Sequence, residues 1–171
     1  MTMNNVKLVL GLFILLTIYS CGPKEINAND KFHGMWQLDK FEAYDNLTNT
    51  WTDDSTRLGW NGYILYDGIG HMGVHLTPKG YQDFKSNKNI DSLNHDDLIP
   101  LAKFYKSNFV YFANYILHEN TIVHNRLSAT EPSNWGKPFT RDFEFRKDTL
   151  ILTAHEIIDG QKIRLRWIKS K

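Results

Sequence analysis

Cysteine is almost absent from this sequence, with Cys21 the only one among 171 residues. A single cysteine excludes an internal disulfide, and its place near the N-terminus suggests another role. An excess of one charge sign is also missing, because 20 Lys and Arg stand against 19 Asp and Glu. Scattered signs and a net charge of +1 predict no nucleic-acid partner. There is no internal repeat or low-complexity segment, and the length predicts one domain.

The first twenty residues have the layout of a secretory signal. A short polar start with Lys7 precedes an apolar run at residues 8–18, and small Ser20 precedes Cys21. The run is too short for an ordinary transmembrane span. The letters I-Y-S-C that end at Cys21 resemble the lipobox of bacterial lipoproteins, in which the cysteine is acylated and becomes the first residue of the mature chain.

That resemblance implies three segments: a signal peptide at residues 1–20, the lipid-attachment residue Cys21 with a polar tether at 21–31, and a folded domain at 32–171. The alternative is an uncleaved anchor followed by a buried free cysteine. Gly22 stands where aspartate is associated with inner-membrane retention in enteric bacteria. We therefore expect a protein anchored by lipid in the envelope of a Gram-negative bacterium, at the outer membrane.

Residues 139–167 alternate between apolar and polar side chains with period two, which predicts three antiparallel strands. A two-residue turn at Lys147 and Asp148 would pair Arg141 with Ala154. An antiparallel meander with one apolar face must bury that face, which predicts a barrel or a sandwich.

The dipeptide Asp159-Gly160 is a strong signal for a type I′ hairpin turn, because both central residues need a positive φ. This turn would pair Ala154 with Leu165 and Leu152 with Trp167.

The inner face of these strands is apolar except for one cation, Arg141, and one anion, Glu156. Arg141 is either the anchor for a polar group on a ligand or the partner of Glu156 in an internal ion pair, since a lone buried charge is costly. The two interpretations are compatible, because a guanidinium has spare donors.

The remaining strands complete an all-β, up-and-down antiparallel barrel of about eight strands with one short helical excursion. Acidic residues at the start and basic residues at the end predict the helix at residues 96–106. A helix between barrel strands is typical of a lid or an end plug. The other strands are expected at residues 32–44, 59–67, 71–77, 109–117 and 121–127.

Histidines occur in two of these strands. His71 and His75 have helical metal-ligand spacing, but on a strand they lie about 13 Å apart, too far for one ion. We therefore predict no metal site. A two-residue loop at residues 119–120 would pair Tyr115 with His124, although the alternation leaves open which face is inside.

Several motifs carry a family resemblance. G-M-W-Q-L at residues 34–38 resembles the G-x-W signature of lipocalins, and N-W at 134–135 is followed by R-x-F at 141–143. The chain from 32 to 168 resembles the bacterial lipocalin-like domain family, which implies a calycin-type barrel with a central cavity. Lys169 stands where lipocalins usually have an arginine that packs over the G-x-W tryptophan.

The function we predict is non-covalent binding of a small, mostly apolar molecule, with no cofactor and no catalytic residue. One alternative is a cavity enzyme of isomerase, hydratase or cyclase type that uses His124 and Tyr115. Another is an interaction module with a filled barrel. In the favoured interpretation Trp36 closes the barrel base, and Trp60 and Trp135 lie at its mouth. The expected ligand-binding residues are Tyr66, Tyr115, His124, Arg126, Trp135, Arg141 and Glu156.

Overall fold

A computed structural model of the chain describes residues 28–55, 60–83, 89–158 and 160–171. The expected signal peptide, Cys21 and most of the expected tether lie outside these residues, as does Asp159.

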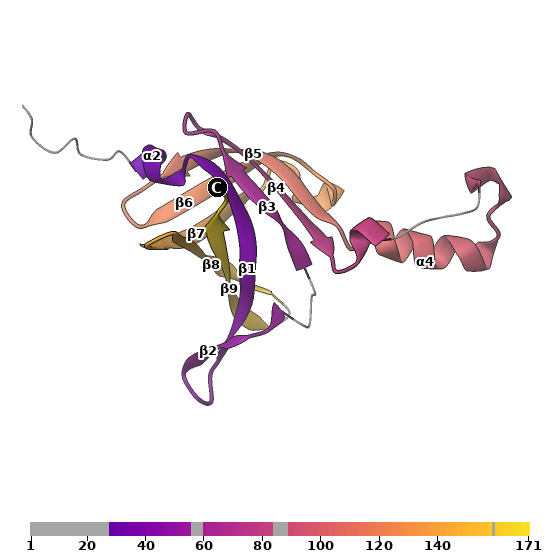
Figure 1. Ribbon diagram of the computed structural model, residues 1–171, viewed down its shortest axis with the longest axis horizontal. Helices are drawn as coiled ribbons and strands as arrows, with labels where there is room; N and C mark the ends of the chain where they lie inside the picture. The colour runs from indigo at the N-terminus through magenta and orange to yellow at the C-terminus, as the bar shows by residue number, and fades with distance from the viewer. Residues whose placement is uncertain (1–27, 56–59, 84–88, 159) are drawn as a thin grey trace, which may run out of the picture.

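Nine strands form one sheet whose neighbours are all antiparallel, in the order β2-β1-β3-β4-β5-β6-β7-β8-β9 (Figure 1). The sheet closes because β1 also pairs with β9, so β1 and β3–β9 make an eight-stranded barrel and β2 is added outside it. The predicted barrel is confirmed. The strands are β1 (Gly34–Asp45), β2 (Thr50–Asp53), β3 (Trp60–Tyr66), β4 (His71–Pro78), β5 (Phe109–Leu117), β6 (Thr121–Ala129), β7 (Pro138–Arg146), β8 (Thr149–Ile158) and β9 (Gln161–Lys169).

A short helix, α2 (Ala28–Phe32), precedes the barrel, where the sequence predicted the end of the tether and the start of the first strand. Phe32 is fully buried, and its carbonyl accepts a hydrogen bond of 2.8 Å from the indole N–H of Trp36. The Phe32 ring meets Tyr66, Phe143 and Phe145 edge-on, each at 5.0 Å. α2 therefore closes one end of the barrel with an aromatic plug.

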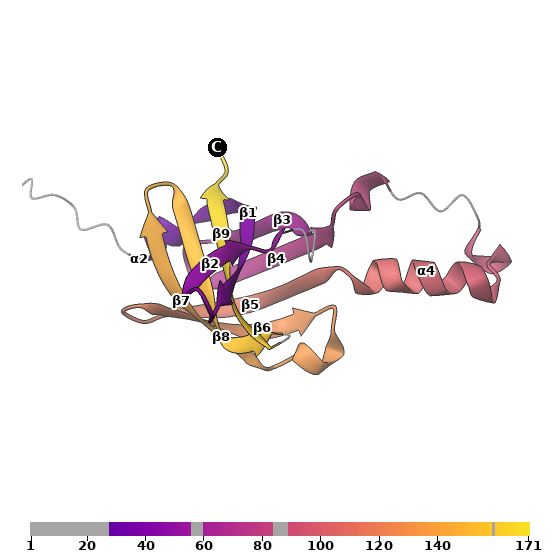
Figure 2. The same cartoon turned by 90° about the horizontal axis from the view of Figure 1, so that it is seen from below.

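The second helix, α4 (His95–Lys106), begins with a capping box in which Asn94 and Asp97 bond each other's backbone N–H. Its end matches the prediction, and Pro100 lies inside the helix. No α4 residue is buried, and the helix projects away from the barrel in both views (Figures 1 and 2). The expectation of a lid or plug is therefore wrong. Short 3-10 turns η1 (Tyr81–Asp83), η2 (Ile90–Ser92) and η3 (Pro132–Asn134) complete the elements.

The register of the last three strands was predicted in part. The turn at residues 147–148 pairs Arg141 with Ala154, as expected. In the last hairpin, Leu152 pairs with Leu165 and Leu150 with Trp167, so the two predicted pairs are wrong. The cause is an irregularity between Thr153 and Ile157 that shifts the register by two residues. A shift of two keeps each side chain on the predicted face.

Candidate functional site

The hairpin of β5 and β6 places the candidate histidine inside the barrel. Tyr115 pairs with His124, as predicted, and Ala113 pairs with Arg126. The structure settles the facing that the alternation left open, because these four residues are buried. Leu127, on the opposite face, is exposed.

Both ring nitrogens of His124 are hydrogen-bonded to tyrosine hydroxyls. Nε2 lies 3.0 Å from the Tyr66 hydroxyl and Nδ1 lies 2.9 Å from the Tyr111 hydroxyl. Burial, together with Arg141 and Arg126 nearby, lowers the pKa of His124 to about 3. His124 is therefore a neutral imidazole at physiological pH, with one nitrogen donating and the other accepting.

This arrangement corrects the partner that we expected for His124. The hydrogen bonds go to Tyr66 and Tyr111, not to Tyr115. Burial raises the pKa of Tyr111 to about 12 and that of Tyr66 well above its ordinary value. A neutral histidine between two protonated phenols is poorly suited to general acid–base catalysis near neutral pH. One of the two tyrosines accepts from His124 and keeps its own O–H free to donate.

Arg141 and Glu156 form the predicted pair across β7 and β8. Nη1 of Arg141 donates to the Glu156 carboxylate and to the carbonyl of Thr140, the latter at 2.8 Å. The Arg141 side chain is 9% exposed and that of Glu156 is 36% exposed. The carboxylate thus sits between the barrel interior and solvent.

Arg126 is buried beside this pair without a carboxylate of its own. Its Nε donates to the Lys137 carbonyl at 2.7 Å, and its guanidinium carbon lies 3.5 Å from the centroid of the Phe139 ring. Nη1 is buried and has no hydrogen-bond partner among the described residues. Burial lowers the pKa of Arg126, but a guanidinium remains charged in proteins.

The interior polar layer therefore has an excess of cationic donors. Among the described strands, two guanidinium groups face one carboxylate, since Glu156 is the only acid beside Arg126 and Arg141. Around His124, two donors are unused: Nη1 of Arg126 and the O–H of the tyrosine that accepts from His124.

A row of aromatic rings runs from this layer toward the barrel end opposite α2, called the far end below. Phe139 lies 6.4 Å from Phe109, and Phe109 lies 5.8 Å from Trp60, both pairs stacked. The Arg141 guanidinium also lies over Phe139, at 4.5 Å. These rings are half-buried, although they pack against the core.

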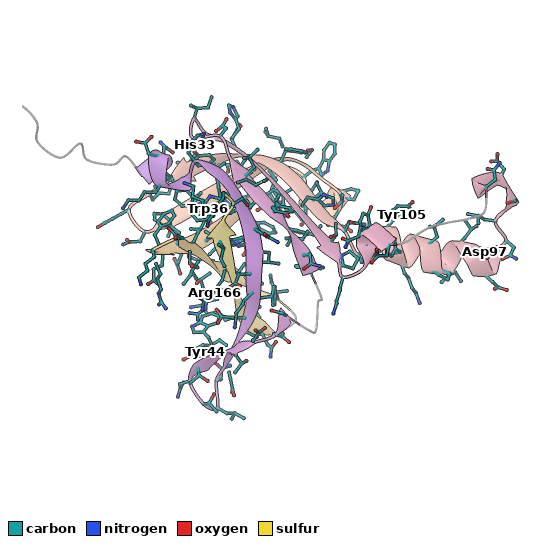
Figure 3. All side chains as sticks on the ribbon, in the orientation of Figure 1. His33, Trp36, Tyr44, Asp97, Tyr105 and Arg166 are labelled. Atoms are coloured by element: carbon teal, nitrogen blue, oxygen red, sulfur yellow. The ribbon has the colours of Figure 1, made fainter. Side chains whose placement is uncertain are left out.

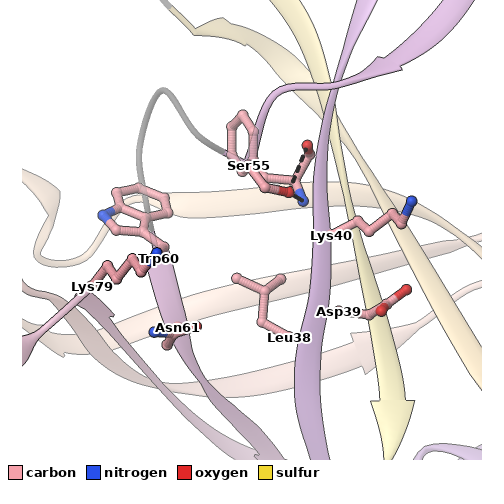
Figure 4. A pocket seen from close by; sticks show the side chains of 8 residues that line it. Leu38, Asp39, Lys40, Ser55, Trp60, Asn61 and Lys79 are labelled. Atoms are coloured by element: carbon pink, nitrogen blue, oxygen red, sulfur yellow. Dashed lines mark hydrogen bonds between the residues drawn. The ribbon is translucent and has the colours of Figure 1, made fainter.

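A pocket opens at the far end where two neighbouring strands separate. β1 pairs with β3 only through residues 34–37, after which β1 stays with β9 and β3 with β4. Figure 4 shows Leu38 on β1 and Trp60 on β3 at the two sides of this opening. The pocket has a volume of about 470 Å³ and is also lined by Asp39, Lys40, Phe41, Ser55, Asn61 and Lys79. Trp60 belongs both to this pocket and to the aromatic row.

A second pocket of about 450 Å³ lies on the other side of Trp60. It is lined by Tyr105, Phe109, Thr130 and other residues from the end of α4 and the β6–β7 connection. The polar layer around His124 lines neither of these two pockets.

The family model of the lipocalin-like domain matches residues 33–169, most of the chain. The chain belongs to the lipocalin-like domain family. No curated protein sequence matches this chain.

Three solved structures resemble this lipocalin-like barrel at low identity. An uncharacterised protein from Bacteroides eggerthii is 12% identical, with a TM-score of 0.42, and the match covers 81% of this chain and 99% of that one. A redesigned β-barrel is 9% identical, covering 86% and 98%, with a TM-score of 0.40. A mutant of the fluorescent protein UnaG is 12% identical, covering 83% and 98%, with a TM-score of 0.38.

Other residues singled out in the sequence lie apart from the polar layer. Trp135 is exposed, and its indole N–H donates to the Ala129 carbonyl at 2.6 Å. His71 is on a strand, as predicted, and its ring pairs with Asp67 at 2.5 Å. Tyr115 packs at the closed end against Tyr66, at 5.2 Å. Within the described ranges, no group of three acidic, histidine or cysteine side chains is placed to hold a metal ion.

Sequence reasoning missed two members of the layer, Tyr111 and Phe139. The alternation placed Phe139 on the inner face of its strand without assigning it to the site, and it would have placed Tyr111 inside once the facing of β5 was known. Across the described residues, no helix is long and apolar enough to span a membrane.

Proposed function

We propose that this protein is an envelope lipoprotein, acylated at Cys21, that binds a small, mostly apolar molecule with an anionic group in the far half of its barrel. The observation that carries the proposal is the buried Nη1 of Arg126, a charged donor without a partner among the described residues. A buried cation is costly unless it is compensated, and an anionic ligand group would compensate it.

The ligand's apolar part is inferred from the aromatic row. Phe139, Phe109 and Trp60 form stacked pairs between the guanidinium groups and the pocket at the far end. Binding sites for small molecules are mostly apolar with a few placed polar groups. A flat apolar molecule that lies along these rings would bring its anionic end to Arg126.

The geometry favours Arg126 over Arg141 as the residue that binds the anionic group of the ligand. Arg141 is paired with Glu156 and the Thr140 carbonyl, which supports a structural role for it. Arg126 has the unused donor, so it takes the role of first contact for the anion. The enzyme alternative is not favoured, because both nitrogens of His124 are occupied and its pKa is lowered to about 3.

The test uses two dyes with the same rings. Anilinonaphthalene sulfonate carries an anion, and phenylnaphthylamine is the same skeleton without it. We expect Arg126→Met to weaken sulfonate-dye binding about tenfold or more, the effect of losing a charge-assisted hydrogen bond, while binding of the neutral dye stays the same. Arg146→Met is the matched control, since Arg146 is exposed and pairs with Glu144 on the outer face.

The proposal fails if the wild-type protein takes up neither dye. It also fails if Arg126→Met lowers binding of both dyes equally, which would indicate a damaged barrel and not a lost anion contact. Native mass spectrometry of the protein from a bacterial host is a separate measurement, which gives the mass of any ligand that the protein retains.

A further inference from the structure

The outer surface of the barrel is divided into a charged half and an uncharged half. Strands β3, β4, β5 and β6 contain only one Lys, Arg, Asp or Glu residue, Arg126, and its side chain is inside. The outward side chains of β7, β9 and β1 include Asp142, Glu144, Lys162, Arg164 and Lys40. The uncharged half, the outer side of β3–β6, is called the neutral face below.

A row of exposed apolar side chains crosses the neutral face, starting from Met35 on the adjoining strand β1 and interrupted at Gly73. The strand register aligns Met35 with Leu65, Leu65 with Gly73, and Gly73 with Phe112, across four strands. Met35, Leu65 and Phe112 are 46%, 51% and 59% exposed. The Phe112 ring lies over Gly73, where a Cβ would be only 2.8 Å from the ring, so a larger residue at position 73 would displace Phe112. Exposed apolar patches of this kind mark interaction surfaces.

The row leads to the closed end of the barrel, where Ile69 at the tip of the β3–β4 loop is 81% exposed. The tip is held in place because Asp67 accepts hydrogen bonds from the backbone N–H of Ile69, at 2.8 Å, and of His71, at 2.9 Å. The loop therefore presents Ile69 outward in a fixed position at the closed-end edge of the neutral face.

The chain leads toward Cys21 from this same corner of the molecule. A Cβ added to Gly68 in the loop would lie 3.1 Å from the ring of His33, the residue that follows α2. Figure 3 shows His33 and Trp36 near α2, and Asp97 and Tyr105 on α4 at the opposite side. Six residues lie between Cys21 and Ala28, and the seven steps from one Cα to the other span at most about 25 Å when extended.

We propose that the neutral face lies on the lipid bilayer, with Ile69, Leu65 and Phe112 at the boundary between headgroups and acyl chains. The proposal rests on the acylation of Cys21, which holds the closed end near the membrane. The strands of this face suit the boundary, because they bring no ion into a region poor in water, and the one carboxylate of the loop, Asp67, is held by the backbone N–H groups of Ile69 and His71 and by the His71 ring. α4 extends from the far end, on the opposite side from α2 (Figures 1 and 2), so a barrel held at its closed end carries α4 farthest from the anchor.

The experiment places one nitroxide label at a time on the full-length chain in vesicles of phosphatidylethanolamine and phosphatidylglycerol. The test sites are Leu65→Cys and Ile69→Cys. Ile157→Cys is the control on β8, which lies between the charged strands β7 and β9; Ile157 is 64% exposed, and Leu98→Cys reports on α4. Oxygen concentrates in lipid and a nickel chelate stays in water, so their relaxation of the label reports its surroundings.

We expect the ratio of oxygen to nickel relaxation to be several-fold higher at the two test sites than at Ile157→Cys and Leu98→Cys. Equal ratios overturn the proposal, as does a high ratio at Leu98→Cys alone. Spin–spin broadening at Phe112→Cys would show a second copy on this face and also overturn it. The mass of the N-terminal peptide separates the two claims: an unacylated Cys21 overturns anchoring and docking together, whereas an acylated Cys21 with water-facing labels overturns docking alone.

Discussion

The guanidinium carbon of Arg126 lies 3.5 Å from the centroid of the Phe139 ring, and Arg141 approaches the same ring at 4.5 Å. One phenylalanine thus separates two buried cations, of which only Arg141 has a carboxylate partner. The attraction of a cation to an aromatic face offsets part of the cost of burial, but it leaves the guanidinium donors unused. The predictions for stability and for binding follow from this imbalance.

Arg126→Met should leave the protein as stable as the wild type or raise the free energy of unfolding by about 1 kcal/mol, because it removes an uncompensated buried charge. Arg164→Met is the contrasting variant, since Arg164 pairs with the buried Glu42 at 2.5 Å. It should lower the free energy of unfolding by about 2 kcal/mol, because it leaves that carboxylate without its closest cation. Urea unfolding measures both. A larger loss for Arg126→Met than for Arg164→Met would contradict this account.

Glu156→Gln should act on the anionic dye in the opposite direction to Arg126→Met. It removes the one carboxylate beside the two guanidinium groups, so the interior becomes more positive. The affinity for the sulfonate dye should rise about threefold to tenfold, as for the loss of a nearby like charge at partial solvent exposure. Binding of the neutral dye should not change. A fall in sulfonate-dye affinity would show that Glu156 organises the site and does not repel the ligand.

The pH dependence of folding should carry the signature of His124. Its pKa of about 3 in the folded protein lies below the ordinary value of 6.5, so the unfolded chain binds the proton more readily. Stability should therefore fall as the pH is lowered from about 6.5 toward 3, by up to about 1.4 kcal/mol per pH unit from this residue. The imidazole signals of His124, assigned by their loss in His124→Asn, should show no titration above about pH 4. A midpoint near 6.5 would mean that the tyrosine contacts are open in solution.

Asp67 should add a second pH range, below that of His124, in which the stability of the fold depends on pH. Burial opposes its ionisation, but hydrogen bonds from the backbone N–H of His71 and Ile69 outweigh burial and lower the pKa of Asp67 to about 2. This contribution to stability is present above about pH 4 and is lost as the pH falls toward 2. Asp67→Asn should therefore flatten the stability curve below about pH 4 and leave the His124 window unchanged, as acid unfolding at several denaturant concentrations would show.

The strands were predictable from the sequence because each has one buried face, so apolar and polar side chains alternate. Ion pairing between Arg141 and Glu156 followed from the same alternation. The register of β9 did not, since β9 pairs with both β8 and β1 and the register shifts between Thr153 and Ile157 of β8, which the alternation of β8 and β9 does not reveal. Nor could sequence show the unused donor of Arg126, which depends on where Lys137 and Phe139 lie in three dimensions.

α2 escaped prediction because five residues are too few to show a helical period. The structure makes its last residue, Phe32, part of the core, in contact with Tyr66, Phe143 and Phe145. Phe32→Ala should lower the free energy of unfolding by about 3–5 kcal/mol, the cost of a cavity left by a large buried ring. Lys31→Ala is the matched control, because Lys31 is exposed and its loss should change stability by less than about 0.5 kcal/mol. Thermal unfolding followed by tryptophan fluorescence suits both variants, since Trp36 donates its indole N–H to the Phe32 carbonyl. If Phe32→Ala were as stable as Lys31→Ala, α2 would belong to the tether and the folded domain would begin at β1.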